Sequence, residues 1–278
     1  MIKLLVCCHR EGEKGDDLIV TVKAGAALGV SDAICDFSDD TGENISAANA
    51  AYNEMTVAYW AWKNYAVLGD PDYIGLMHYR RYFYLDERKK DAVLRTDAPK
   101  GLFREKALLS EEKLGDLLER GDFVCPRPLM RRSVYKQYAL TQDRRDLDLA
   151  VDILNRLSPE YAETARRYLA GKECYFFNMF IFPREIFMRY CAFIFPILDE
   201  FVREKGETGR LFISERLTGV FIAKLIEEGL QPICLPVLFD EKGGSFRQKW
   251  AKAKGLKAKA LTVARVFVRR RGEWRRIQ

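Results

Sequence analysis

Short apolar runs alternate with longer amphipathic stretches along most of this chain. The almost wholly apolar runs predict buried strands at 3–8, 73–77, 122–125, 175–182 and 232–237. The amphipathic stretches predict helices at 47–65, 110–119, 141–170, 184–203 and 211–228. Because helical crossovers link the strands, the pattern predicts an α/β fold with a mainly parallel central sheet.

Charge is divided unevenly between the body of the chain and its last residues. With 278 residues, 48% of them hydrophobic, the chain can bury one large core, so we expect one domain at 1–240. Residues 242–278 hold 13 Lys or Arg against the single acid Glu273, and the remainder has 33 basic and 39 acidic residues. The sequence therefore predicts a basic tail at 241–278 that is separate from a mildly acidic domain.

The tail alternates basic residues with apolar ones such as Trp250, Leu256 and Leu261. This composition favours an amphipathic helix lying on an anionic membrane surface. Nucleic acid is a competing partner for such charge, but no stacking platform or nucleic-acid motif accompanies it, so we expect none. A merely solvated tail is the other alternative.

The cysteines and the N-terminus bear on where the protein works. Seven cysteines are scattered through apolar runs without CxxC spacing, a usage typical of a reducing compartment. The first apolar run is too short for a signal peptide, and no run approaches the ~20 apolar residues that span a bilayer. We expect a cytoplasmic protein, peripheral on the inner face of the cell membrane.

Both histidines follow directly after a predicted strand. His9 and Arg10 end the first strand, and His78 is followed closely by Arg80 and Arg81. Polar side chains at the carboxyl ends of parallel strands face the ligand crevice of an α/β sheet, and clustered guanidiniums suit phosphate oxygens. The alternatives are structural histidines and solvated surface arginines.

Four further polar residues are candidates for a site. Asp40 and Asn44 lie in an acidic turn and can contact a ribose or a base edge, although such turns are often only solvated. Asn178 interrupts an apolar strand, where an amide needs a partner and serves either as a structural bridge or as a ligand contact. Glu215, near the start of a helix, is either a general base or an ion-pair partner of Arg216.

Five strings in this order resemble the domain-of-unknown-function 4422 family, whose members are bacterial proteins associated with capsular and exopolysaccharide glycosyl transfer. They lie at 44–46, 59–64, 73–83, 177–181 and 214–217, and the resemblance spans roughly 2–240. The most specific are Trp-Lys-Asn at 62–64 and His-Tyr-Arg-Arg-Tyr at 78–82. The resemblance implies a GT-A-like fold, Rossmann-like in its nucleotide-sugar half.

The resemblance also implies roles for individual residues. Relatives of this fold place a metal-binding Asp-x-Asp where this chain has His78-Tyr79-Arg80, which suggests a site without a metal cofactor, while Mn or Mg held by Asp39, Asp40 or His9 stays open. The expected catalytic residues are Glu215, His78 and Arg80. The expected donor-binding residues are His9, Arg10, Asp40, Asn44, Lys63, Arg80 and Arg81. Asn178 and Arg216 are expected to bind the acceptor.

These expectations combine into one leading hypothesis for the function. A hexose moves from a nucleotide-diphosphate sugar, with uridine as the expected nucleoside, to a lipid-linked or growing surface polysaccharide. The partners are then the nucleotide-sugar donor, the glycan acceptor and an anionic membrane under the tail. The alternatives are a non-catalytic nucleotide-sugar or glycan-binding component of polysaccharide assembly, and a nucleic-acid binder that acts through its basic tail.

Overall fold

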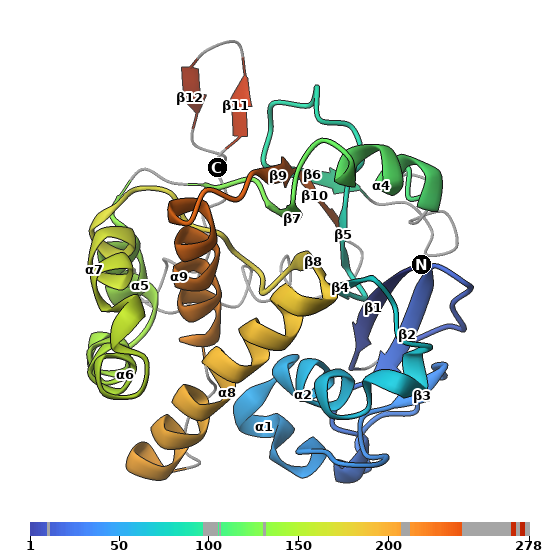
Figure 1. The fold of residues 1–278 in the computed structure, drawn as a ribbon, viewed down its shortest axis with the longest axis horizontal. Helices are drawn as coiled ribbons and strands as arrows, with labels where there is room; N and C mark the ends of the chain where they lie inside the picture. Colours follow the sequence, from blue (N-terminus) through green and yellow to red (C-terminus); the bar gives the residue numbers. More distant parts are fainter. Residues whose placement is uncertain are drawn as a thin grey trace, which may run out of the picture.

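The computed structural model describes residues 1–9, 12–96, 105, 107–129, 132–206, 212–240, 268–270 and 273–275. These residues form an α/β fold around a ten-stranded sheet (Figure 1). The predicted fold class is confirmed.

The first half of the sheet is parallel and carries the N-terminus. Its order is β3 (Phe37–Ser38), β2 (Ile19–Lys23), β1 (Ile2–Cys8) and β4 (Tyr73–His78). Their side chains are almost all buried in β1, β2 and β4, which explains the continuous apolar runs. Because the four strands run in one direction, their carboxyl ends share one edge of the sheet.

Strand β4 is the point where the sheet branches. On one side it pairs antiparallel with β8 (Phe180–Pro183), which pairs antiparallel with β7 (Phe123–Pro126), and β7 pairs parallel with β9 (Pro232–Leu235). After His78 the chain turns directly into β5 (Arg81–Phe83).

The second branch continues from β5 to the last strand of the domain. Strand β5 pairs antiparallel with β10 (Val237–Asp240), which pairs parallel with β6 (Val93–Thr96). The turn between β4 and β5, which contains Arg80, is therefore held at a junction of two sheet branches.

Eight helices pack around this sheet in the described part of the chain. They are α1 (Asn49–Tyr52), α2 (Met55–Lys63), α4 (Glu111–Leu118), α5 (Val134–Thr141), α6 (Arg144–Leu157), α7 (Ala162–Ala170), α8 (Arg184–Lys205) and α9 (Ser214–Glu227). Short 3-10 turns span Ala26–Leu28, Ser46–Ala48, Tyr65–Leu68 and Pro159–Tyr161. Ser110, Ser133 and Asp143 cap α4, α5 and α6 through side-chain oxygens that accept backbone N–H groups.

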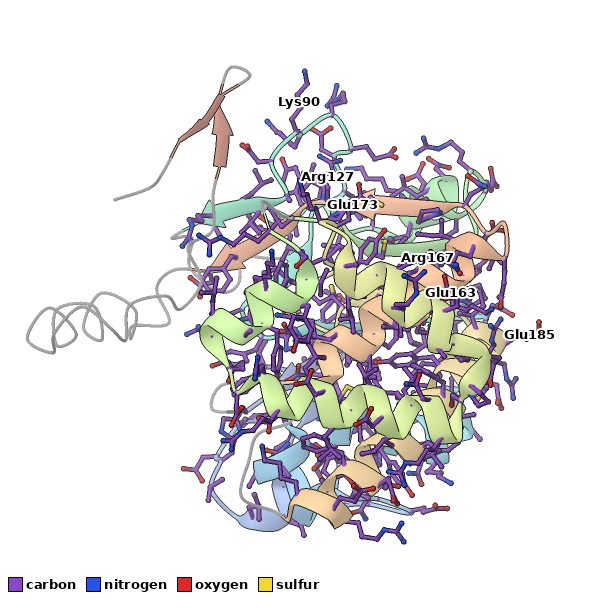
Figure 2. The ribbon with its side chains drawn as sticks, turned by 90° about the vertical axis from the view of Figure 1, so that its left-hand side faces the viewer. Lys90, Arg127, Glu163, Arg167, Glu173 and Glu185 are labelled. Atoms are coloured by element: carbon purple, nitrogen blue, oxygen red, sulfur yellow. The ribbon has the colours of Figure 1, made fainter. Side chains whose placement is uncertain are left out.

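Helices α5, α6 and α7 form an outer layer over α8 and α9 (Figure 1). The face seen in Figure 2 carries charged side chains such as Glu163 and Arg167 of α7, which form an ion pair of 2.8 Å. Arg167 also bonds Glu227 of α9, and this ties the outer layer to the inner one.

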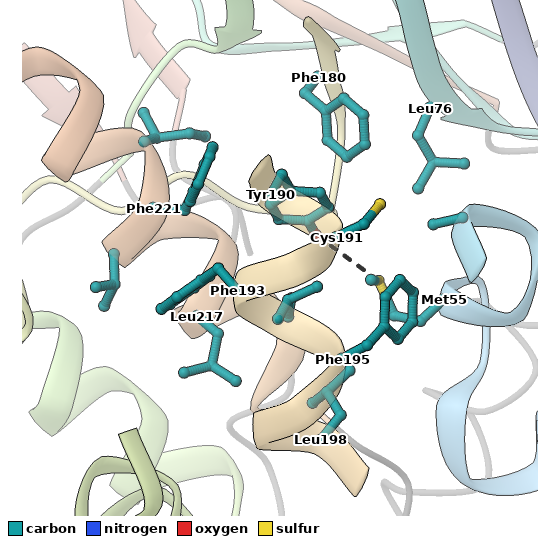
Figure 3. Close-up of a cluster of buried hydrophobic side chains, with 14 of the residues drawn as sticks. Met55, Leu76, Phe180, Tyr190, Cys191, Phe193, Phe195, Leu198, Leu217 and Phe221 are labelled. Atoms are coloured by element: carbon teal, nitrogen blue, oxygen red, sulfur yellow. Dashed lines mark hydrogen bonds between the residues drawn. The ribbon is translucent and has the colours of Figure 1, made fainter. Parts of the chain in front are cut away.

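The main core is built around α8, whose aromatic residues reach the sheet and two neighbouring helices (Figure 3). The ring of Tyr190 lies 5.0 Å from Phe180 of β8 and 5.2 Å from Phe221 of α9, both fully buried. Its hydroxyl lies 3.9 Å from Met55 Sδ of α2. Since each large buried side chain contributes about 1.5–3 kcal/mol, this cluster fixes α2, α8 and α9 relative to one another.

The structure differs from the predicted elements where polar or strained residues interrupt an apolar pattern. The predicted helix at 47–65 breaks at Asn53, whose φ is +52°, and the predicted helix at 141–170 breaks at Ser158-Pro159. The predicted strand at 175–182 begins only at Phe180. Strands β2, β3, β5 and β6 and helix α5, none of them predicted, are short.

Six residues of the tail also differ from the predicted helix. Val268–Arg270 and Glu273–Arg275 form β11 and β12, an antiparallel pair. Residues 241–267 lie outside the described residues. No helix in the described part of the chain is both long and apolar enough to cross a membrane.

Candidate functional site

The predicted cluster begins where β4 ends. His78 pairs in register with Cys7 at the end of β1, and its ring is 8% exposed. Its Nε2 lies 2.5 Å from the carbonyl oxygen of Phe177, so Nε2 carries the proton and donates it. Burial, followed by the charge of Arg81, lowers the pKa of His78 despite the opposing effect of Glu54. His78 is therefore a neutral donor that holds the neighbouring chain, and the predicted contact with phosphate stays a prediction.

The chain segment that His78 holds is strained. Phe177 and Asn178 have φ values of +80° and +50°, in a region that costs about 1–3 kcal/mol for side chains of this kind. Asn178 is 1% exposed, and its amide donates to Glu54 Oε1 and to Ser214 Oγ at 2.8 Å each and accepts from Thr218. These bonds offset the strain and give Asn178 the role of a structural bridge, and its predicted contact with the acceptor stays a prediction.

Glu54 is a site residue that the sequence analysis did not identify. It follows the strained Asn53 directly, at the start of α2, and bonds Asn178. Its charge raises the pKa of Glu215. It also opposes the lowering of the pKa values of His78 and Arg81 that burial causes. Glu54 therefore lies within electrostatic reach of His78, Arg81 and Glu215.

Arg81 is the cation at the centre of the cluster. Its guanidinium lies 4.9 Å from the ring of Phe177 and 5.3 Å from that of Phe239, and its buried Nε has no hydrogen-bond partner among the described residues. Burial, opposed by the charges of Glu215 and Glu54, lowers its pKa. A buried donor without a partner is costly, so this guanidinium is suited to an anionic ligand. Arg80, the next cation, also lies beside Phe239, at 5.6 Å.

Glu215 lies in the first turn of α9, opposite Arg81. Its side chain is 27% exposed and accepts from Arg216 Nη1 at 3.2 Å. Burial by surrounding atoms and the charge of Glu54 raise its pKa, while Arg216 and Arg81 lower it, and the balance is a raised pKa. A carboxylate that is open to a ligand and more basic than usual has the properties of a general base.

Arg216 faces away from solvent, with a side chain that is 5% exposed. Besides Glu215 it bonds Gln137, and its guanidinium lies 5.1 Å from the ring of Phe176 and 5.4 Å from that of Tyr138. Like Arg81 it has a buried Nε without a partner in the described residues. Glu215 thus bonds Arg216 directly and lies within electrostatic reach of Arg81.

The side chains at the end of β4 are one imidazole and two guanidiniums, and His78 Nε2 is engaged with a carbonyl. Guanidiniums do not bind metal ions, so the predicted independence from a metal stays a prediction for this site. Within the described ranges, no three His, Cys, Asp or Glu side chains are arranged to hold a metal ion. Asp39, fully buried, uses both oxygens to accept from Gly25, Ala26 and Ser46, so it serves the fold.

A pocket of about 490 Å³ opens at the ends of β2 and β3, along the same sheet edge. Its lining residues include Lys14, Lys23, Asp36, Phe37 and Thr41. Cys7, at the end of β1, lies within electrostatic reach of both Asp39 beside this pocket and Glu54 in the cluster. The pocket and the cluster are therefore neighbouring parts of one edge.

The loop that borders the pocket is held by α2. Trp60 donates its indole N–H to Thr41 Oγ1 at 2.9 Å, and Asn64 donates to the Glu43 carbonyl at 2.9 Å. Lys63 forms an ion pair of 3.0 Å with Glu43 and lies over the Trp62 ring. Trp60, Lys63 and Asn64 thus position the loop, and Lys63 is engaged there rather than in the arginine cluster.

The remaining predicted donor residues lie around this edge. Asp40 is exposed and accepts from Ser38, while Asn44 bonds the backbone of Gly42 and Ser46, and neither lines the pocket. His9 is exposed directly after β1. Arg10 lies outside the described residues.

A family model described as domain of unknown function (DUF4422) matches residues 3–227. The chain belongs to this family. The match contains β1, β4 and α9, so the cluster and Glu215 lie within the DUF4422 domain.

One solved structure similar to this DUF4422 chain is the apo form of WbbM, a bifunctional glycosyltransferase. The two are 27% identical with a TM-score of 0.76, over 86% of this chain and 45% of the WbbM chain. This chain therefore spans less than half the length of WbbM. No curated protein matches it.

Two kinds of site residue in this DUF4422 domain carried only weak signals in the sequence. Glu54 is an acid at the start of an apolar helix, which usually reads as a first-turn charge. Lys14 and Lys23 flank a strand of five residues that was not predicted, so their position at the sheet edge followed only from the structure.

Proposed function

We propose that this DUF4422 chain is a glycosyltransferase that moves a sugar from a nucleotide-diphosphate sugar to a glycan acceptor. The observation that carries the proposal is that Arg81, whose buried Nε has no partner in the described part of the chain, lies within electrostatic reach of Glu215, a carboxylate with a raised pKa. Glycosyl transfer needs both an anion-stabilising group and a base at one reaction centre. The similarity to WbbM supports the same class of reaction.

Arg80 and Arg81 act on the leaving group. As the bond between the anomeric carbon and the diphosphate oxygen breaks, negative charge grows on that oxygen. A guanidinium already fixed between the rings of Phe177 and Phe239 stabilises this charge without reorganisation. Loss of one such donor typically costs about 10²–10³-fold in rate.

Glu215 acts on the acceptor. Its carboxylate removes the proton from an acceptor hydroxyl while that oxygen bonds to the anomeric carbon. The raised pKa suits this role, because a more basic carboxylate takes the proton more readily. Arg216 fixes the carboxylate through its Nη1.

The pocket at the ends of β2 and β3 is suited to the nucleoside. Its volume of about 490 Å³ falls in the range of small-molecule sites, and Lys14 and Lys23 in its wall favour a polyphosphate ligand. Phe37 supplies an aromatic surface that is braced by Trp60 at 5.5 Å. In this proposal the nucleoside is uridine, the transferred sugar is a hexose, and no metal cofactor takes part.

The basic residues of the tail bear on where the protein works. Residues 242–278 hold the charge that would attach the protein to an anionic membrane, at which a lipid-linked or growing polysaccharide acceptor is presented. The protein would then work in the cytoplasm, peripheral on the inner face of the membrane.

The nucleotide part of this proposal is tested by a thermal-shift panel of uridine, guanosine, cytidine and thymidine diphosphates and their sugars, each run with manganese and with a chelator. We expect one uridine-diphosphate sugar to raise Tm equally under both conditions, and Arg81→Gln to abolish the rise. Stabilisation that requires manganese, or none by any nucleotide, would contradict the proposal.

A further inference from the structure

Two half-buried phenylalanines lie beside the cluster. The ring centroids of Phe176 and Phe177 are 6.0 Å apart with planes at 46°. Three residues later, Phe180 and Phe182 are fully buried in the core. The left-handed backbone at Phe177 separates the two pairs, because it turns the chain before the strand begins. A strained backbone thus keeps two large apolar rings partly open to solvent.

The two rings are flanked by the charged groups of the site. Arg81 lies 4.9 Å from the Phe177 ring, and Arg216 lies 5.1 Å from the Phe176 ring. Glu215 bonds Arg216 and lies within electrostatic reach of Arg81. Glu215, the proposed base, therefore lies next to an apolar surface, and the guanidiniums of Arg81 and Arg216 contact the two rings of that surface.

The network below the rings holds them in this position. His78 donates to the Phe177 carbonyl, and Asn178 is bonded by Glu54, Ser214 and Thr218. Five buried or partly buried polar groups thus maintain a backbone that is unfavourable for Phe177 by about 1–3 kcal/mol. Strain of this kind clusters at ligand-binding positions, so these rings are candidates for a binding surface.

We propose that Phe176 and Phe177 form the floor of an acceptor subsite that binds a pyranose ring. A pyranose has C–H groups on its faces and hydroxyl groups around its rim, so it needs an apolar surface bordered by polar groups. The two rings supply that surface, and the partly exposed Glu215 and Arg81 supply the border. This inference rests on the proposed function, since it places the acceptor hydroxyl beside the base.

Saturation-transfer NMR tests the subsite without knowledge of the natural acceptor. The probes are methyl β-galactopyranoside, methyl β-glucopyranoside and methyl α-mannopyranoside, with uridine diphosphate present and the protein's aromatic protons irradiated. For the full-length wild type we expect at least one probe to receive saturation mainly on the protons of one face. Phe176→Leu should weaken that probe's binding about 2- to 10-fold, the value of one aromatic contact, and Phe176→Tyr should restore it.

Phe177→Leu provides a second variant that removes the other ring, and circular dichroism with Tm measurements verifies that each variant is folded. No saturation of any probe in the wild type would overturn the inference. So would wild-type binding in folded Phe176→Leu and Phe177→Leu.

Donor-side measurements on the same samples separate this inference from the proposed function. Release of nucleoside diphosphate from nucleotide sugars in the absence of acceptor is measured on the full-length wild type. If the wild type releases nucleoside diphosphate and the probes bind folded Phe176→Leu as they bind the wild type, the subsite is wrong and the glycosyltransferase proposal stands. If probes bind through Phe176 but no nucleotide sugar is bound or cleaved, the subsite stands as a glycan-binding site and the proposed function fails.

Discussion

At the residue scale, the chemistry depends on how charges near Glu215 set its basicity. Burial raises the pKa of this carboxyl group, Glu54 raises it further, and Arg216 and Arg81 act in the opposite direction. A general base must be deprotonated to act, so kcat/KM should rise as the pH increases through this pKa.

This rise of kcat/KM with pH forms the acid limb of the pH profile. Substitutions that remove a positive or a negative charge near Glu215 should therefore move the acid limb in opposite directions. Glu54→Gln keeps an oxygen that can accept from Asn178 but removes a negative charge, which lowers the pKa of Glu215 and shifts the limb to lower pH. Arg81→Gln removes a positive charge and shifts the limb to higher pH, in addition to reducing the rate. The measurement is the pH dependence of kcat/KM for nucleotide release.

Glu185 provides the control for these variants. It is exposed at the start of α8 and points away from the body of the molecule (Figure 2). Glu185→Gln should leave the acid limb in place. Identical limbs in the wild type, Glu54→Gln and Arg81→Gln would show that Glu215 is not the titrating base.

At the element scale, helix α2 organises the loop that borders the nucleoside pocket. The buried indole of Trp60 has its N–H bonded to Thr41, which lines the pocket. Thr41→Val removes this acceptor, and we expect a loss of about 1–3 kcal/mol in unfolding free energy together with weaker nucleotide binding. Thr41→Ser keeps the hydroxyl and is the matched control. Chemical denaturation measures the unfolding free energy, and calorimetric titration with uridine diphosphate measures nucleotide binding. Equal unfolding free energies and affinities in Thr41→Val and Thr41→Ser would show that the Trp60–Thr41 hydrogen bond does not support the pocket.

The elements also show how far the sequence predicts this structure. Strands β1 and β4 were predicted because they are buried on both faces and their apolar runs are unbroken. The segment before Phe180 was predicted as strand because Tyr175, Phe176 and Phe177 are apolar, and apolarity does not report a positive φ. The edge strand β3, with two residues, is too short to produce a pattern.

The candidate site was predictable to a similar extent. His78, Arg80, Arg81 and Glu215 stand at element ends, where sequence position indicates a site. Glu54 could not be found this way, because its place in the cluster depends on the break at Asn53 and on the long-range bond to Asn178.

At the scale of the whole molecule, we expect separable roles for the mildly acidic residues 1–240 and the basic residues 242–278. Deletion of residues 242–278 should leave nucleotide release and Tm unchanged. The arginine cluster and the hydrophobic core residues on both faces of the sheet all lie before residue 241. The same deletion should abolish co-sedimentation with phosphatidylglycerol vesicles, whose anionic surface attracts the 13 basic residues. If the full-length protein does not bind these vesicles but binds oligonucleotides in a salt-sensitive way, the partner of the tail is nucleic acid and not a membrane.

The central claim is that Glu215 and Arg81 form one glycosyl-transfer centre, and it is tested most directly by acceptor-dependent nucleotide release from the nucleotide sugar that stabilises the protein. A mixed pool of glycan and glycolipid acceptors serves as the second substrate, in the presence of chelator. The account predicts turnover by the wild type and a loss of about 10²-fold or more in both Glu215→Gln and Arg81→Gln. Wild-type rates in both folded variants would contradict it.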